Sequence, residues 1–266
     1  MKSQFHRPAS APLIIGATGG SGTRVVARLA RHAGYDLGEN VNASEDAMAF
    51  RSFHEKWVNR FAAAQDRHKP FSKSETARMA KDFEHALARH GGAGERWGWK
   101  TPRAIYLLPF LHAQFPRLKF IHVIRDGRDM AFSRNQNQLR KHGTAILSLT
   151  ERWSLPKPVR SILLWERVNL RAALYGEMHL RQNYLLLRFE DLCRASIQHT
   201  RRVMEFLHAN VDVDEIARAE VSPPTSIGRW HNESPDMLAE MERVAAVALK
   251  KFGYLEREPR LRSLNV

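Results

Sequence analysis

Cysteine is almost absent from this sequence, in which Cys193 is the only one among 266 residues. A single cysteine excludes an internal disulfide and gives no sign of an oxidising compartment. Long apolar runs are absent too, since no stretch approaches the roughly 20 apolar residues of a membrane span. Residues 1–12 have no apolar core and do not resemble a signal peptide. We therefore expect a cytoplasmic protein.

Patterns typical of metal sites and of repeat proteins are also missing. The 13 histidines show no paired spacing with cysteines or acids, so we expect no metal. No segment of the chain is repeated. The length suits one large domain with an ample core, so we expect a single domain over residues 1–266. Within it, residues 1–11 are expected to form a loose N-terminal arm and residues 256–266 a peripheral tail.

Acidic residues are outnumbered by basic ones. The 42 Lys and Arg against 28 Asp and Glu give a formal net charge of +14. Such an excess favours a polyanionic ligand or an anionic surface, such as a phosphorylated cofactor, a membrane face or nucleic acid. Charge alone does not choose among these partners, and a basic but generic surface is the competing interpretation.

The most informative stretch is residues 13–29. Residues 13–15 are a short apolar run, as in a buried parallel strand, and Thr23 begins a segment with helical spacing. Between them lie Gly16, Gly19, Gly20 and Gly22, and glycine lets a ligand approach the backbone closely. A strand, a glycine-rich turn and a helix N-terminus form an anion site, because the first helical N–H groups are unpaired. Ser21 and Thr23 add hydroxyl groups, and Arg24 adds a cation.

This stretch predicts an α/β fold with a P-loop-like parallel sheet flanked by helices, but three kinds of loop compete for it. A nucleoside-triphosphatase loop requires Gly-Lys-Ser/Thr, and no lysine follows any of these glycines. GATGGSG looks more like the first turn of NAD(P)-binding short-chain reductase-like proteins. Residues 34–42 are too polar for the second strand of that fold, and the chain has no Tyr-x-x-x-Lys. The third interpretation depends on motifs further along the chain.

Two later segments place basic residues at the same edge of the predicted sheet. Trp99 ends a short strand, which puts Lys100 at a strand's carboxyl end, where open α/β sheets bind ligands. Residues 119–124 are the clearest buried strand, and they lead into Arg125 and a helix predicted to run through Ser133. Eight residues are close to two helical turns, so the two side chains form a plausible phosphate clamp. The competing interpretations are a surface lysine and an internally paired charge cluster.

Four motifs follow one another along the chain: GGSGTR after a first strand, WKTP, FIHVIRDGRD with Ser133, and YLLLRFEDL. In this order they resemble the sulfotransferase superfamily, in the broad bacterial branch that includes relatives of tyrosylprotein sulfotransferases. These proteins use 3′-phosphoadenosine 5′-phosphosulfate (PAPS) as donor and release adenosine 3′,5′-bisphosphate (PAP). The donor-binding residues that the resemblance implies are Gly19, Gly20, Ser21, Gly22, Thr23, Arg24, Arg125, Ser133 and, in the late segment SIGRW, Arg229. Lys100 falls on the lysine that is catalytic in the tyrosylprotein branch.

The sequence departs from the family pattern at two places. Many members have Lys or Arg directly before Ser-Gly-Thr, where this chain has Gly20. Either Arg24 supplies the missing charge from one helical turn away, or Lys100 contributes more. The family's Tyr-Glu-Asp is changed at its first residue to Phe189, which removes any hydrogen bond from that tyrosine.

The resemblance implies transfer of a sulfuryl group to an acceptor hydroxyl by in-line displacement. We expect Arg24 and Lys100 to stabilise charge, and Glu39 or Asp46 to take the acceptor's proton; the sequence does not separate these two acids. The acceptor is expected to be a small molecule or glycan, for example a lipid-linked sugar. We expect no specific nucleic acid, and peripheral contact with an anionic membrane surface remains open. The alternative function is an NAD(P)-binding reductase-like protein.

Hydrophobic spacing also predicts the elements around these motifs. Helices are expected at 45–64, 73–90 and 161–180, and a final strand at 184–187. Residues 144–158 show little periodicity and contain two prolines, so a loop is expected there.

Overall fold

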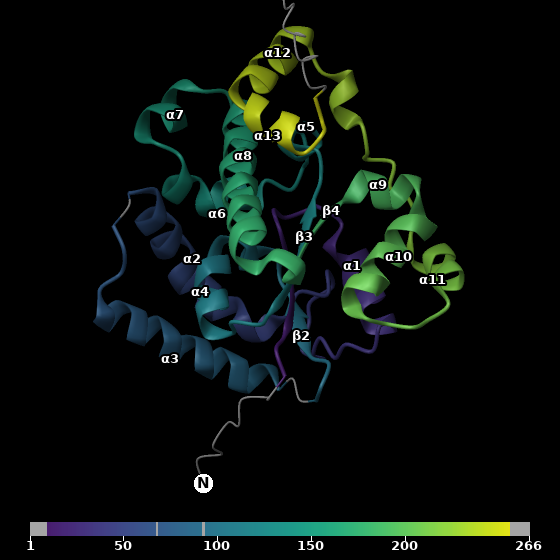
Figure 1. Cartoon of the computed structure of the whole chain (residues 1–266). Helices are drawn as coiled ribbons and strands as arrows, with labels where there is room; N and C mark the ends of the chain where they lie inside the picture. The colour runs from purple at the N-terminus through teal and green to yellow at the C-terminus, as the bar shows by residue number, and fades with distance from the viewer. Residues whose placement is uncertain (1–9, 68, 92–93, 256–266) are drawn as a thin grey trace, which may run out of the picture.

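The computed structural model describes residues 10–67, 69–91 and 94–255 (Figure 1). All but the last two residues of the predicted N-terminal arm, and all of the predicted tail at 256–266, lie outside the described residues.

Four strands form the central sheet, in the order β2-β1-β3-β4. The strands are β1 (Leu13–Ala17), β2 (Gly98–Lys100), β3 (Lys119–Ile124) and β4 (Tyr184–Arg188). All three pairings are parallel, which confirms the predicted parallel α/β sheet. The register aligns Ile15 with both Lys100 and Ile121, so the segments that follow these strands leave the sheet at one edge.

Side chains of the inner strands alternate between two hydrophobic cores. Ile14 and Phe120 belong to the core on one face, and Ile15 and Ile121 to the core on the other. All four side chains are fully buried. In Figure 1, α2, α3, α4 and α8 lie on one side of the sheet and α1, α10 and α11 on the other. This two-sided cover explains why β1 and β3 read as continuous apolar runs.

The helices surround this sheet over the whole described chain. The α-helices are α1 (Thr23–His32), α2 (Arg51–Asp66), α3 (Lys73–His90), α4 (Leu108–Gln114), α5 (Gly127–Ala131), α6 (Asn137–Ile146), α7 (Leu149–Ser154), α8 (Lys157–Tyr175), α9 (Phe189–Arg194), α10 (Ser196–Leu207), α11 (Val213–Glu220), α12 (Pro235–Val244) and α13 (Ala246–Lys251). Shorter helical turns are η1 (Met48–Phe50), η2 (Pro102–Leu107), η3 (Gly176–Leu180), η4 (Arg181–Asn183) and η5 (Arg229–Asn232).

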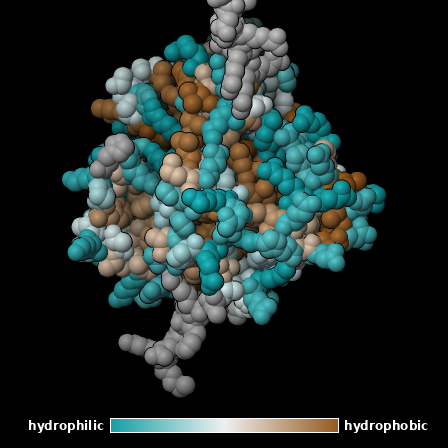
Figure 2. All heavy atoms as spheres, viewed as in Figure 1, coloured by the Kyte–Doolittle hydropathy of each residue, from teal (hydrophilic) through white to brown (hydrophobic). Residues whose placement is uncertain are grey.

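The predicted helix at 73–90 coincides with α3, and the predicted strand at 184–187 is extended by one residue in β4. The loop predicted at 144–158 is wrong, because α7 and the ends of α6 and α8 occupy most of it. A capping box starts α7: the backbone N–H of Glu151 donates to Ser148 Oγ (3.2 Å), and that of Ser148 donates to the Glu151 carboxylate (2.8 Å). Figure 2 shows hydrophilic residues over most of this face, with hydrophobic ones exposed where Figure 1 draws α7 and α8.

Candidate functional site

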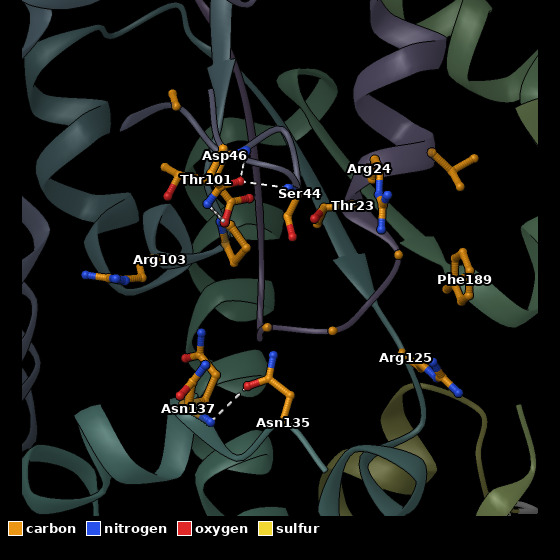
Figure 3. Close-up of a pocket in the computed structure, with 18 of the residues that line it drawn as sticks. Thr23, Arg24, Ser44, Asp46, Thr101, Arg103, Arg125, Asn135, Asn137 and Phe189 are labelled. Atoms are coloured by element: carbon orange, nitrogen blue, oxygen red, sulfur yellow. Dashed lines mark hydrogen bonds between the residues drawn. The ribbon is translucent and has the colours of Figure 1, made fainter. Parts of the chain in front are cut away.

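A cavity of about 720 Å³ opens at the edge where the strands end (Figure 3). Its wall combines the loop after β1, the segments that follow β2 and β3, and side chains from α2 and α6. The sequence predicts that the ligand binds at this edge, where the carboxyl ends of the parallel strands meet. The cavity therefore gathers in one place motifs that lie more than 100 residues apart in the chain.

The glycine-rich loop has the backbone shape that its sequence predicts. Gly20 (φ 91°) and Gly22 (φ 82°) have left-handed conformations, and Gly22 caps the N-terminus of α1. A Cβ atom on Gly22 would lie 2.2 Å from the ring of Phe189. Gly19 and Thr23 line the cavity with them. Only glycine fits at position 22, and its absent side chain leaves the first N–H groups of α1 open to a ligand.

Ser21 behaves differently from its neighbours in the loop. Its side chain is fully buried and is not part of the cavity wall. The hydroxyl donates a hydrogen bond of 2.6 Å to the carbonyl of Thr18. This hydrogen bond joins two residues of the same loop, and the contact of the Ser21 hydroxyl with a ligand stays a prediction.

Arg24 and Arg28 lie one helical turn apart on α1, and both line the cavity. Arg28 is neutralised, because it donates to Glu45 (3.0 Å) and Glu220 (3.4 Å). Arg24 is exposed and takes part in no ion pair among the residues that the structure describes. An unpaired guanidinium thus lies at the loop where this chain has Gly20 in place of the family's basic residue.

Lys100 is one of the most buried side chains of the protein, at 1 % exposure. Its Nζ lies 2.6 Å from the Asp46 carboxylate and also donates to the carbonyl of Ser44. Burial lowers the pKa of Lys100, and the hydrogen bond from Lys100 to Asp46 opposes this shift. Asp46 and Ser44 line the cavity, whereas Lys100 itself does not. The interpretation of Lys100 as a surface lysine is therefore wrong. Its ammonium group contacts the cavity wall only indirectly, by its ion pair with Asp46 and its hydrogen bond to Ser44.

The structure distinguishes between Glu39 and Asp46, the two candidates for the general base. Asp46 lines the cavity next to Lys100, while Glu39 is exposed and lies outside the cavity wall. The placement favours Asp46 over Glu39 for contact with an acceptor.

Arg125 leaves β3 at the other end of the cavity, with 5 % exposure. Its Nη2 donates to Asp129 (2.9 Å) and to the hydroxyl of Ser226 (3.2 Å). Asp129 also accepts from the backbone N–H of Gly228 (3.0 Å), which fixes the late loop against Arg125. The Nε of Arg125 is buried without a hydrogen-bond partner. Arg229 donates from its Nε to the Ser226 carbonyl (3.2 Å), and burial and the charge of Arg125 lower the pKa of Arg229.

The charge cluster after β3 is partly structural, as the competing interpretation held. Arg128 pairs with Asp126 (2.8 Å) and Glu242 (2.5 Å), and it is not part of the cavity wall. Arg125 alone of the two arginines lines the cavity.

The predicted helix through Ser133 is wrong, since α5 ends at Ala131. The side-chain amide of Gln136 donates to the carbonyls of Met130 and Ala131 (3.0 Å each) and so replaces the next helical N–H groups. Ser133 Oγ accepts from the N–H of Asn135 (3.2 Å), and Asn135, not Ser133, lines the cavity. Ser133 is thus not part of the cavity wall that Arg125 lines, and the phosphate clamp of Arg125 and Ser133 stays a prediction.

Several lining residues were missed by the sequence analysis: Arg51, His54, Arg103, Lys141 and His142. Arg103 had a local signal, because it follows Lys100 by three residues at the same sheet edge. The others lie on α2 and α6, which only tertiary packing brings to this wall. Burial and Arg103 lower the pKa of His54 to about 3 and that of His142 to about 4, so both rings are neutral at pH 7.

In the described part of the chain, no group of three or more His, Cys, Asp or Glu side chains is arranged to hold a metal ion. No helix described here is both long and apolar enough to cross a membrane.

A parallel sheet whose first strand leads through a glycine loop into a helix, at a cavity rich in arginine, defines a P-loop-like nucleotide-binding fold. The particular family follows from comparison: the sulfotransferase family model matches residues 12–213, and the chain belongs to this family of enzymes. No curated protein matches the sequence. The NAD(P)-binding reductase interpretation finds no support.

Solved structures of two sulfotransferases and of a retinol dehydratase share the fold at low sequence identity. The sulfotransferase STF9 from Mycobacterium avium is 15% identical, with a TM-score of 0.53, over 96% of this chain and 79% of that one. A sulfotransferase from Alicyclobacillus acidocaldarius is 17% identical, with a TM-score of 0.51, over 94% and 98%. A retinol dehydratase in a complex with retinol and PAP is 14% identical, with a TM-score of 0.50, over 93% and 83%. These likenesses establish the fold.

Proposed function

We propose that this protein transfers a sulfuryl group from PAPS to the hydroxyl group of an acceptor. The observation that carries the proposal is the cavity itself, whose wall brings together the glycine-rich loop, Arg125, and Asp46, which is paired with Lys100. The retinol dehydratase of the same fold was crystallised with PAP, the donor's product.

Two features of the wall fit a phosphorylated nucleotide. Gly20 and Gly22 leave room for an anion against the N-terminus of α1, where the helix dipole is positive. The buried Nε of Arg125 lacks an acceptor, and a phosphate oxygen is the kind of acceptor that a guanidinium binds best. We assign the 5′ end of the donor to the loop and to Arg24, and the 3′-phosphate to Arg125 and Arg229.

The bound donor supplies the sulfuryl group, and the protein's residues position it and stabilise charge. The first N–H groups of α1 and the guanidinium of Arg24 hold anionic oxygens at the loop. Lys100 supplies positive charge behind the wall, and the low dielectric around the buried ammonium strengthens its electrostatic effect on the cavity. Asp46 accepts the proton of the acceptor hydroxyl, because it is the carboxylate that both lines the cavity and lies beside Lys100.

The finer assignments about acceptor, partners and cell compartment are part of this proposal. We propose a small-molecule or glycan acceptor, since the retinol dehydratase of this fold binds the small molecule retinol. We propose a cytoplasmic location and one domain, in which the two hydrophobic cores share strands β1, β3 and β4.

Calorimetric titration with PAP tests the donor site directly. We expect micromolar binding to the parent protein and at least tenfold weaker binding to Arg125→Ala. Arg218→Ala is the matched control, because Arg218 is an exposed arginine on α11 outside the cavity wall. Absence of PAP binding by a folded parent protein would overturn the proposal, and so would equal loss in both variants.

A further inference from the structure

The cavity wall carries more positive charge than its own acids neutralise. The lining cations are Arg24, Arg28, Arg51, Arg103, Arg125 and Lys141, and the lining acids are Asp46 and Glu220. Both acids are already paired. Asp46 forms an ion pair with Lys100. The carboxylate of Glu220 lies 3.4 Å from the guanidinium of Arg28 and 3.0 Å from the imidazole of His32. The remaining cations therefore have no carboxylate of the wall available to them.

The unpaired charge gathers at the end of the cavity opposite Arg125. Arg103 comes from η2, Lys141 from α6 and Arg51 from α2. Figure 3 shows Arg103 and Asn137 on one side of the glycine-rich loop, and Arg125 on the other. Within the described residues, Arg103 and Lys141 take part in no ion pair, and Arg51 pairs only with Glu55.

These cations lie close enough to repel one another. The charge of Arg103 is the main cause that lowers the pKa of Lys141. The acid near them, Glu55, has its pKa lowered mainly by its hydrogen bond from Arg51 and further by Arg103 and Lys141, and it lies outside the cavity wall. Like charges in one place cost free energy unless an anion joins them, which makes such a cluster a functional-site candidate.

We infer that the acceptor carries an anionic group in addition to the hydroxyl that receives the sulfuryl group, and that Arg103 and Lys141 bind this group. The inference rests on the proposed function, which places the donor at the other end of the cavity. Carboxylate, phosphate and sulfate share the oxygen chemistry that an arginine fork and a lysine ammonium recognise. A neutral acceptor would leave both cations unpaired beside it.

The neutral wall around these cations suits a polar acceptor. Asn135, Asn137 and Gln138 supply amide groups that donate and accept hydrogen bonds. The two uncharged imidazoles of His54 and His142 add no further repulsion at neutral pH. In this proposal the charges of Arg103 and Lys141 favour an anionic acceptor, and the amide groups orient it by hydrogen bonds.

The test uses PAP-saturated protein, so that the donor end is filled, and titrates it with phenyl phosphate as the anionic probe. Benzyl alcohol is the neutral probe of similar size. We expect phenyl phosphate to bind the parent protein, and its affinity to fall at least fivefold in Arg103→Gln and in Lys141→Gln. The control Arg218→Gln should bind as the parent does, since it removes one surface charge elsewhere. Thermal melting shows that each variant is folded.

The inference is overturned when phenyl phosphate fails to bind the PAP-saturated parent protein, or when it binds all three variants equally. Benzyl alcohol binding as tightly as phenyl phosphate would overturn it as well. The proposed function fails separately, when PAP itself does not bind the parent. Because the PAP titration precedes the probe titration, the two failures are told apart within one experiment.

Discussion

The Nζ of Lys100 and the carboxylate of Asp46 lie 2.6 Å apart, and the pair joins a completely buried cation to the cavity wall. A buried ammonium is costly unless it is paired, because it loses its hydration. The Ser44 carbonyl accepts a second hydrogen bond from the same ammonium. Asp46 therefore supports the fold, and in the proposed function it also accepts the proton of the acceptor, so the two roles call for separate tests.

Asp46→Ala is expected to destabilise the protein by roughly 3 kcal/mol, because the buried Lys100 charge then has no counter-ion. The double variant Asp46→Ala/Lys100→Met should recover most of that loss, since a neutral chain of similar length fills the site. Urea unfolding at pH 7 of the parent, Asp46→Ala, Lys100→Met and the double variant measures both effects.

Activity is expected to respond differently to the same substitutions. Lys100→Met should lower kcat by about 10²–10³ if Lys100 stabilises developing charge. The double variant should remain equally inactive although it is stable again. Recovery of activity together with stability would show that the pair is purely structural.

Arg24 and Arg28 offer a second matched comparison within one helix. Arg24→Ala should weaken PAP binding by at least tenfold with little change in Tm, because Arg24 has no ion-pair partner among the described residues. Arg28→Ala should affect PAP binding less, since its charge is taken up by Glu45 and Glu220. PAP titration and thermal melting of both variants check this order, and the reverse order would remove Arg24 from the donor site.

The backbone of the site was predictable from sequence because its signals are local. An apolar run, four glycines and a helical spacing follow one another within residues 13–29, and β1, the loop and α1 form as predicted. Lys100 and Arg125 were placed correctly at the sheet edge, since each directly ends or follows a short strand. A strand end has a defined direction, so the position of the next residue is nearly fixed.

The contacts of the same side chains were not predictable. Nothing in the sequence shows that Lys100 binds the Ser44 carbonyl, or that Gln136 ends α5 before Ser133. Lys141 enters the site only because α6 packs beside α2, and that packing depends on residues far apart in the chain. The missed helix α7 did have a local signal, the Ser148-x-x-Glu151 capping box.

Gly22→Ala is expected to destabilise the protein by about 3 kcal/mol and to abolish PAP binding. The added Cβ would lie 2.2 Å from the Phe189 ring, and the residue would be held at φ 82°. Left-handed strain and overpacking each cost about 1–3 kcal/mol. Urea unfolding and PAP titration measure the two losses.

Gly91→Ala is the control for strain without a clash. Gly91 has φ 71° at the end of α3, and no described atom lies within 4 Å of its added Cβ. The Gly91→Ala substitution should lower the free energy of unfolding by about 1 kcal/mol and leave PAP binding intact. Equal losses in the two variants would mean that Phe189 moves aside and that the close contact at Gly22 has no role.

The buried imidazole of His122 is expected to make the stability of the folded protein depend on pH. Its ring is fully buried in β3, and the Nε2–H donates to Asn169 Oδ1 (2.8 Å). The Asn169 amide is oriented by its own hydrogen bond to the Trp165 carbonyl (2.6 Å), so its oxygen must face the ring. The hydroxyl of Tyr184 then donates to Nδ1 (2.6 Å). The neutral ring has all its hydrogen bonds, and burial lowers the pKa of His122 to about 4.

Between pH 6.5 and about 4 the unfolded chain therefore binds a proton at His122 that the folded protein does not. Stability from this group is complete above pH 6.5 and is lost as the pH falls through that window. One pKa unit corresponds to about 1.4 kcal/mol, so the loss at His122 reaches roughly 3 kcal/mol by pH 4. Urea unfolding at pH 7, 6 and 5 should show this decline, and His122→Gln should decline less steeply although it starts lower. A nuclear magnetic resonance titration that gave His122 a pKa near 6.5 in the folded protein would contradict the buried neutral ring.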